Sequence, residues 1–163
     1  MIDNYLLKIG IIFNFESKVL KFGAEELKCF LQKKVYLIFE NEGSSERKES
    51  FDRIIKLVVD KKLQDTSFII KSGYVKNIPV LELIGHNESA VINAIYTFLE
   101  NIGIKFEITG PIIPKKLKYS RWEQFNCHIV PAVKHRGIRQ HINFPMDISS
   151  YTIEDISIGK FIC

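Results

Sequence analysis

The chain has 163 residues, of which 46% are hydrophobic and 26% are charged. This is the ordinary mix of a globular protein with one real core, and the net charge of +4 is too small to demand an acidic partner. No stretch reaches the roughly 18 apolar residues of a membrane span, and the first residues lack the basic segment of a signal peptide. We therefore expect no membrane partner and a cytoplasmic location for the chain as written.

The first third of the chain predicts a strand, a helix and a second strand. Residues 5–13 are a short apolar run rich in β-branched and aromatic residues, which is typical of a buried strand. Apolar residues at three- and four-residue steps predict a helix over 17–33, with Ser17 as its N-cap. Residues 35–39 predict another strand.

The next segment predicts a loop and a second helix. Residues 41–50 contain no apolar side chain, which indicates a loop. The apolar residues that follow recur at helical spacing and predict a helix over 51–62. They are Phe51, Ile54, Ile55, Val58 and Val59.

Two further strands are predicted at 67–71 and 79–84, and the turn residues between them indicate an antiparallel pair. A stripe of apolar residues predicts a helix over 88–102, with Asn87 able to cap its start and Gly103 suited to its end. A strand at 104–108 follows.

The Gly/Pro-rich residues 109–114 should interrupt regular structure, because proline cannot donate a backbone hydrogen bond. Beyond Pro114 the chain changes character. Residues 115–122 resemble a connector, and alternating residues at 138–144 predict a strand with one polar face.

The element order predicts an α/β (α+β) fold, a mixed β-sheet with two or three helices packed on it. We expect one domain over 1–114 and a second, incomplete unit over 115–163. The edges of an isolated strand at 138–144 would lack hydrogen-bond partners, so we expect residues 119–163 to be mobile, loosely docked or self-associating.

Two helix motifs resemble the N-terminal accessory domain of bacterial α-glucuronidases, which also precedes the barrel of β-N-acetylhexosaminidases. Residues 21–31, K-F-G-A-E-E-L-K-C-F-L, are similar to the A-A-E-E-L-x-x-Y-L helix of that domain. Residues 94–106, A-I-Y-T-F-L-E-N-I-G-I-K-F, are similar to its A-x-Y-x-F-L-E-x-L-G-x-R-W/F segment. The Gly/Pro turn at 110–114 also fits, and the resemblance spans about 5–114.

A third segment, P-A-V-K-H-R-G-I at 131–138, is similar to the P-x-F-x-x-R-G opening of the first strand of the catalytic (β/α)8 barrel in hexosaminidase-like enzymes. The resemblance implies that Arg136 hydrogen-bonds the hydroxyls of a terminal sugar. The residues that follow, R-Q-H-I-N-F-P at 139–145, depart from the Asp-containing run of the family, so the sugar and the subfamily stay open.

The resemblance implies a non-catalytic accessory domain of a glycoside hydrolase, with the first strand of a truncated catalytic barrel attached. In that family an Asp-Glu pair farther along the barrel assists the substrate's acetamido group, so this chain alone should hydrolyse nothing. Its partner would be the catalytic barrel domain or a glycan, and the parent enzyme could be exported. Two pairs of adjacent carboxylates, Glu25-Glu26 and Glu154-Asp155, are weak catalytic candidates.

Metal, thiol and cofactor chemistry find little support in the sequence. His128, His135 and His141 match no zinc spacing, and the cysteines, Cys29, Cys127 and Cys163, fit no disulfide framework. Cys127 and His128 would point to opposite faces of a strand, which disfavours a Cys-His nucleophile. No glycine-rich phosphate loop is present, so we expect no cofactor.

Two other functions stay open. The chain could be a free-standing carbohydrate-binding or protein-interaction module without a catalytic partner. A minor alternative is nucleic-acid binding, because basic side chains with an aromatic ring can hold phosphates and stack a base. That alternative rests on Lys115, Lys116, Lys118, Arg121 and Trp122.

Overall fold

The structure, a computed structural model, describes residues 8–31, 34–39, 51–107, 110–115, 117–118, 122 and 124–133. Its elements in chain order are β1 (Lys8–Phe13), α1 (Lys18–Leu31), β2 (Lys34–Phe39), β3 (Arg53–Val59), β4 (Phe68–Val75), β5 (Ile78–Gly85), α2 (Glu88–Asn101), β6 (Lys105–Glu107), β7 (Gly110–Ile112) and β8 (Asn126–Ile129). The loop predicted at 41–50 and the strand predicted at 138–144 lie outside these residues. So does the predicted start of a barrel.

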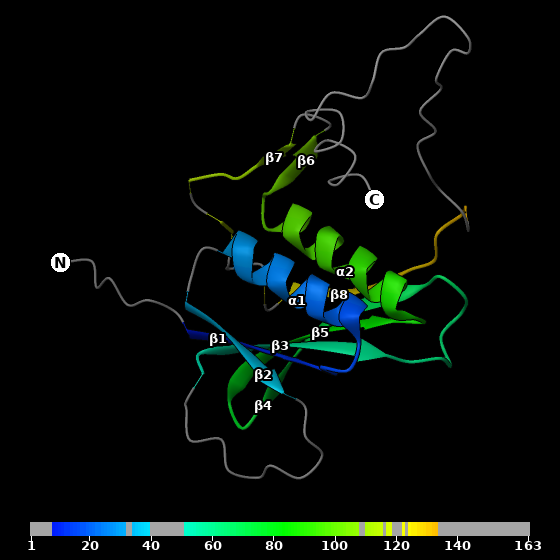
Figure 1. Cartoon of the computed structure of the whole chain (residues 1–163), viewed down its shortest axis with the longest axis horizontal. Coiled ribbons are helices and arrows are strands. Elements are labelled where there is room, and N and C mark those ends of the chain that lie inside the picture. Colours follow the sequence, from blue (N-terminus) through cyan, green and yellow to red (C-terminus); the bar gives the residue numbers. More distant parts are fainter. Residues whose placement is uncertain are drawn as a thin grey trace, which may run out of the picture.

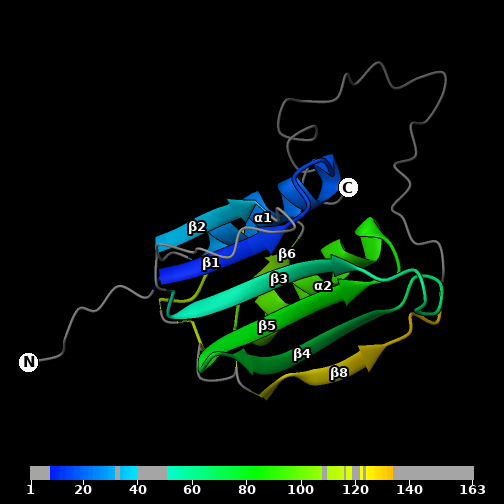
Figure 2. The same cartoon turned by 90° about the horizontal axis from the view of Figure 1, so that it is seen from below.

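One mixed sheet of six strands carries the fold, in the order β2-β1-β3-β5-β4-β8 (Figures 1 and 2). Strands β2, β1, β3 and β5 are parallel, whereas β4 runs antiparallel to both β5 and β8. The predicted mixed sheet with helices packed on it is therefore confirmed.

Helices α1 and α2 lie side by side on the same face of the sheet (Figure 1). Their apolar stripes meet the apolar side chains of β1, β3, β4 and β5 in one continuous core. The caps expected from sequence are present: Ser17 Oγ accepts the amide of Leu20 at 3.0 Å, and Asn87 Oδ1 accepts that of Ala90 at 2.9 Å. No helix of the described residues is long and apolar enough to cross a membrane.

The predicted helix over 51–62 is wrong, because Arg53–Val59 form β3 at the centre of the sheet. Ile55 and Leu57 face the helices, while Ile54 lies on the opposite face in a smaller cluster with Ile12 and Val80. A parallel strand with apolar contacts on both faces has a nearly continuous apolar sequence, and such a run also satisfies helical spacing.

Strands β4 and β5 form the predicted antiparallel pair, joined at Lys76 and Asn77. Both residues have positive φ angles, 48° and 64°, as a two-residue hairpin turn of the primed type requires. The turn therefore lies at Lys76 and Asn77, and Gly73 belongs to β4.

The prediction that residues 109–114 interrupt regular structure is wrong for Gly110–Ile112. Gly110–Ile112 form β7, a short strand that pairs with β6 in a separate two-stranded sheet. Proline is tolerated there because Pro111 lies in a strand that pairs on one side within the described residues.

The predicted connector contributes to the core. Trp122 is fully buried, with its ring edge-on to Phe98 at 5.3 Å and beneath the Arg53 guanidinium at 5.4 Å. Ser72 of β4 holds the chain beside it, since its Oγ donates to the carbonyl of Trp122 and accepts the amide of Phe125. Strand β8 then extends the sheet beyond β4, so described residues on both sides of Pro114 share one core.

Candidate functional site

A cleft of about 590 Å³ opens where the carboxyl ends of β1, β3 and β5 meet the first turns of α1 and α2. Ligand sites in sheets of this kind commonly lie beyond the carboxyl ends of parallel strands. The cleft is lined by Asn14, Ser17, Leu20, Leu57, Val58, Val59, Lys61, His86, Asn87, Glu88 and Ser89.

Both helices begin at this cleft. Backbone amides of a first turn that have no partner within the helix create a positive potential at its N-terminus. The side chains of Ser17 and Asn87 cap one amide each, and both residues also line the cleft. The site therefore combines two positive helix ends with hydroxyl and amide groups.

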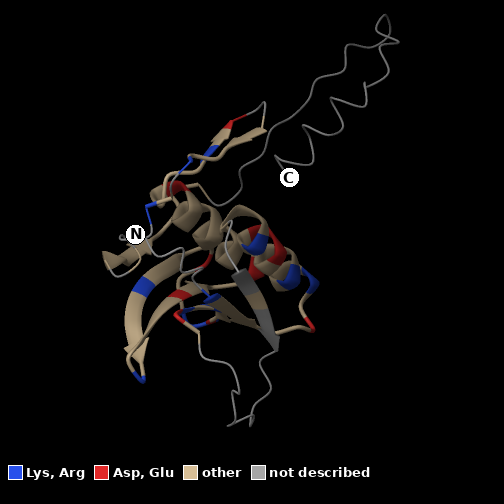
Figure 3. Cartoon of the chain, turned by 90° about the vertical axis from the view of Figure 1, so that its left-hand side faces the viewer, with Lys and Arg blue, Asp and Glu red and all other residues tan. Residues whose placement is uncertain are grey.

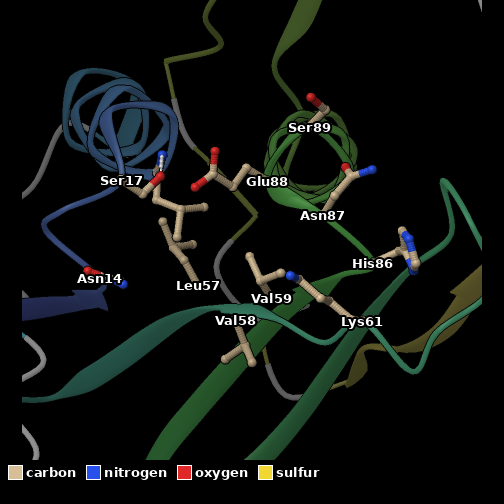
Figure 4. A pocket seen from close by; sticks show the side chains of 11 residues that line it. Asn14, Ser17, Leu57, Val58, Val59, Lys61, His86, Asn87, Glu88 and Ser89 are labelled. Atoms are coloured by element: carbon tan, nitrogen blue, oxygen red, sulfur yellow. Dashed lines mark hydrogen bonds between the residues drawn. The ribbon is translucent and has the colours of Figure 1, made fainter.

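Charged groups lie on different sides of the cleft (Figure 4). The Glu88 carboxylate lies between the two helices on the side of Ser17, and Lys61 reaches back toward Val59. Glu88 partly offsets the positive helix ends, so the cleft presents both signs of charge within a small volume.

His86 lies at the far rim and has a defined orientation. Its Nδ1 is 2.7 Å from the carbonyl oxygen of Leu63, which can only accept, so the ring proton lies on Nδ1. Nε2 lies 3.8 Å from the Asp65 carboxylate, and in the neutral ring it is an acceptor. The imidazole is therefore held at the edge of the cleft by loop residues.

The groups that line the cleft can bind a small polar molecule. The lining residues include one carboxylate, Glu88, whereas glycoside hydrolysis usually requires two that flank the scissile bond. Asn14, Ser17 and Lys61 can donate to oxygen atoms, and Glu88 can accept from hydroxyl groups. A small polar molecule matches these groups.

Glu25 and Glu26, the carboxylate candidates that the structure describes, do not line this cleft. Glu25 is exposed on α1, and Glu26 accepts a hydrogen bond from the Tyr96 hydroxyl at 2.9 Å. Glu26 therefore has a structural role between the helices. Glu154 and Asp155 lie outside the described residues, as does Arg136.

Among the histidine and cysteine candidates, the structure describes Cys29, Cys127 and His128. On β8, Cys127 packs against the core and His128 is exposed, as the alternation of a strand predicts. His135, His141 and Cys163 lie outside the described part of the chain. Among the residues that are described, no three metal-binding side chains converge.

The basic stretch considered for nucleic acid loses its aromatic component, because Trp122 is buried in the core and cannot stack a base. Lys115 and Lys118 are exposed, whereas Lys116 and Arg121 lie outside the described residues. In Figure 3, where the ribbon is coloured by charge, Lys and Arg positions and Asp and Glu positions both occur along the described elements.

Sequence reasoning missed Asn14, Lys61, His86 and Glu88 as site residues. The sequence feature that could have indicated them is a polar residue directly after a parallel strand. Asn14 follows β1, and His86 follows β5. The signal was lost because 51–62 was predicted to be a helix, which removed β3 and the strand end beside Lys61.

Comparison of the chain with models of known protein families and with curated proteins finds no match. The resemblance to glycosidase accessory domains therefore rests on the motif residues alone.

Proposed function

We propose that this chain is a non-catalytic accessory domain of a glycoside hydrolase, one that packs against a (β/α)8 catalytic barrel in carbohydrate metabolism. The observation that carries the proposal is a direct contact between the two helix motifs that resemble the accessory domain. The Glu26 carboxylate of the first accepts a hydrogen bond from the Tyr96 hydroxyl of the second, at 2.9 Å.

Other motif residues take part in the same contact. Phe106, the aromatic residue that ends the second motif, lies edge-on to both Phe30 and Tyr96, with ring centroids 5.4 and 4.9 Å apart. Gly23 departs from the alanine of the motif, and a Cβ atom there would lie 2.6 Å from the side-chain ends of Ile92 and Ile95. Glu26, Tyr96 and Phe106, which match the motifs, thus take part in one packing arrangement, which supports a common scaffold.

The barrel start at 138–144 and a sugar contact by Arg136 belong to this proposal as well. Under it, Arg136 would fork onto vicinal hydroxyls or a carboxylate at the opening of a barrel strand. The described residues end at Val133, before this segment.

The test is an assay of the purified chain on aryl glycosides of glucuronic acid, N-acetylglucosamine and xylose. We expect no turnover above a buffer blank, and turnover that follows the protein through purification contradicts the proposal. Sequencing of the DNA around the coding region is a second test. A reading frame for a (β/α)8 glycosidase on the same strand supports a catalytic partner, and its absence favours a free-standing module.

The second candidate function is binding of an acidic sugar in the cleft. The observation that favours it is the meeting of Lys61 with two positive helix ends, beside hydroxyl-binding groups at Asn14 and Glu88. A uronate carries a carboxylate and vicinal hydroxyls, so it matches both sets of groups.

Titration with glucuronate, followed by amide chemical shifts, tests this candidate, with glucose as the neutral control. We expect Lys61→Gln to weaken glucuronate binding by up to about fivefold, the effect of losing one exposed charge contact. The adjacent Lys62→Gln is the matched control, because Lys62 is exposed and does not line the cleft. Equal effects of the two substitutions would contradict a site at Lys61.

A further inference from the structure

Strand β8 forms one edge of the sheet, and its outer side has no strand partner among the described residues (Figure 2). Proteins usually block such edges with charged side chains, proline or a bulge. The sequence of β8, Asn-Cys-His-Ile, contains no Lys, Arg, Asp, Glu or Pro. Within the described part of the chain, this edge therefore carries none of the usual blocks to pairing with another strand.

The hydrogen bonds to β4 identify which backbone groups face outward. The amide of Ser72 donates to the carbonyl of Phe125 at 2.8 Å, so Phe125 bonds toward the sheet. Because bonding alternates along an antiparallel strand, Cys127 and Ile129 also bond inward. The N–H and C=O groups of Asn126 and His128 then face the open edge, and both residues are exposed.

A groove of about 530 Å³ lies beside this edge, between β8 and α2. Its lining includes half-buried Phe125, Cys127 and Ile129 from the β8 side and Thr97 and Asn101 from α2. None of its lining residues is charged, although charged residues make up 26% of the chain. The groove therefore fits an uncharged extended strand with apolar side chains at alternate positions.

We propose that this edge pairs with β8 of a second copy of the chain, antiparallel and across a twofold axis at Cys127. The strand itself has the chemistry that the groove requires, since it is uncharged and its apolar residues alternate. In this register Asn126 pairs with His128 of the second copy. All outward-facing N–H and C=O groups of the two residues then form hydrogen bonds. The two sheets then become one continuous sheet.

The same register matches side chains on both faces. On the helix side Phe125 lies opposite Ile129 of the second copy, which brings apolar groups together, and Asn126 lies opposite His128 on the other side. Cys127 lies opposite Cys127 of the second copy in a non-hydrogen-bonded pair, with Cα atoms about 4.5 Å apart. That distance lies within the range of about 4.4–6.8 Å that a disulfide bridges.

Sedimentation equilibrium of the full chain, with cross-linking by mild oxidation, tests the pairing and its register. A variant with Cys29→Ser and Cys163→Ser keeps Cys127 and should form a covalent dimer on oxidation. The matched control carries Cys127→Ser and Cys163→Ser, and keeps Cys29, which is exposed on α1. We expect the control to yield little covalent dimer.

A second variant tests the edge without a thiol. Asn126→Lys with His128→Lys places lysine opposite lysine twice in the dimer and leaves both residues exposed in the monomer, so association should weaken by about tenfold or more. Near-UV circular dichroism checks that its fold is kept. A chain that stays monomeric, equal cross-linking in the Cys29 control, or a lysine variant that associates like the parent would each overturn the proposal. Binding of an unrelated extended peptide by a monomeric chain would also overturn it.

Discussion

Gly85 ends β5 at the point where the first turn of α2 meets the sheet. A Cβ atom at this position would lie 2.4 Å from the amide nitrogen of Val91 and 2.8 Å from the carbonyl oxygen of Asn87. These neighbours are backbone atoms, which cannot move aside as the end of a side chain can. Gly85 therefore sets the distance between β5 and α2, and with it one wall of the cleft.

We expect Gly85→Ala to lower the free energy of unfolding by about 2 kcal/mol, because the helix must shift to accept the methyl group. Chemical denaturation checks this. Gly73→Ala is the matched control, since Gly73 lies in β4, is exposed, and has no atom within 4 Å of the added Cβ. If both variants lose the same stability, close packing is not the reason for Gly85.

Among the elements, helices α1 and α2 pack against each other, and a hydrogen bond between Tyr96 and Glu26 connects them. Burial raises the pKa of Tyr96 well above its ordinary value, and the hydrogen bond to Glu26 and the charge of that carboxylate raise it further. The folded state thus keeps a proton on the hydroxyl that the unfolded chain releases at a lower pH.

A raised pKa in the folded state means that the contribution of Tyr96 is complete below its unfolded pKa of about 10 and is lost as pH rises above it. We expect Tyr96→Phe to lower stability at neutral pH by about 1 kcal/mol, the usual effect of losing one hydrogen bond. The variant should also show a smaller alkaline decrease than the parent. Urea unfolding at neutral pH and above pH 10 checks both points.

Tyr74→Phe is the control for this measurement, because Tyr74 is 63% exposed on β4. It should leave the stability close to that of the parent at both pH values. A parallel alkaline decrease in the parent and in Tyr96→Phe would contradict the role given to the hydroxyl.

At the scale of the whole molecule, described residues after Pro114 cover one side of the hydrophobic core. Trp122, the only tryptophan of the chain, contacts Phe98 of α2, and Phe98 also contacts Phe125. These contacts join α2 to the strand that extends the sheet. Residues 1–114 alone would leave the Phe98 side of the core uncovered.

A chain that ends at Pro114 should therefore be less stable than one that ends at Val133, by about 3–5 kcal/mol, the usual effect of removing a buried Trp side chain. Thermal unfolding and binding of a hydrophobic dye compare the two. In the longer chain, Trp122 fluorescence should be blue-shifted and resistant to quenching by acrylamide, because the ring is fully buried. Equal stability of the two chains would place the domain boundary at Pro114, as the sequence predicts.

Local patterns in the sequence were enough to predict much of the fold. The helix faces, the caps Ser17 and Asn87 and the C-terminal Gly103, with its φ of 113°, depend on residues close in the chain. The same holds for the antiparallel pairing of β4 and β5, which a short turn joins. Short-range geometry determines these features, so a single sequence carries them.

Tertiary structure decided what depends on distant neighbours. The apolar run of β3 fits a helix or a buried strand, and only its place between β1 and β5 selects the strand. Trp122 is part of the core because Phe98 and Arg53 surround it, contacts that no local pattern encodes. The cleft follows the same rule, since Asn14, Lys61 and His86 come together only because three parallel strands end at one edge.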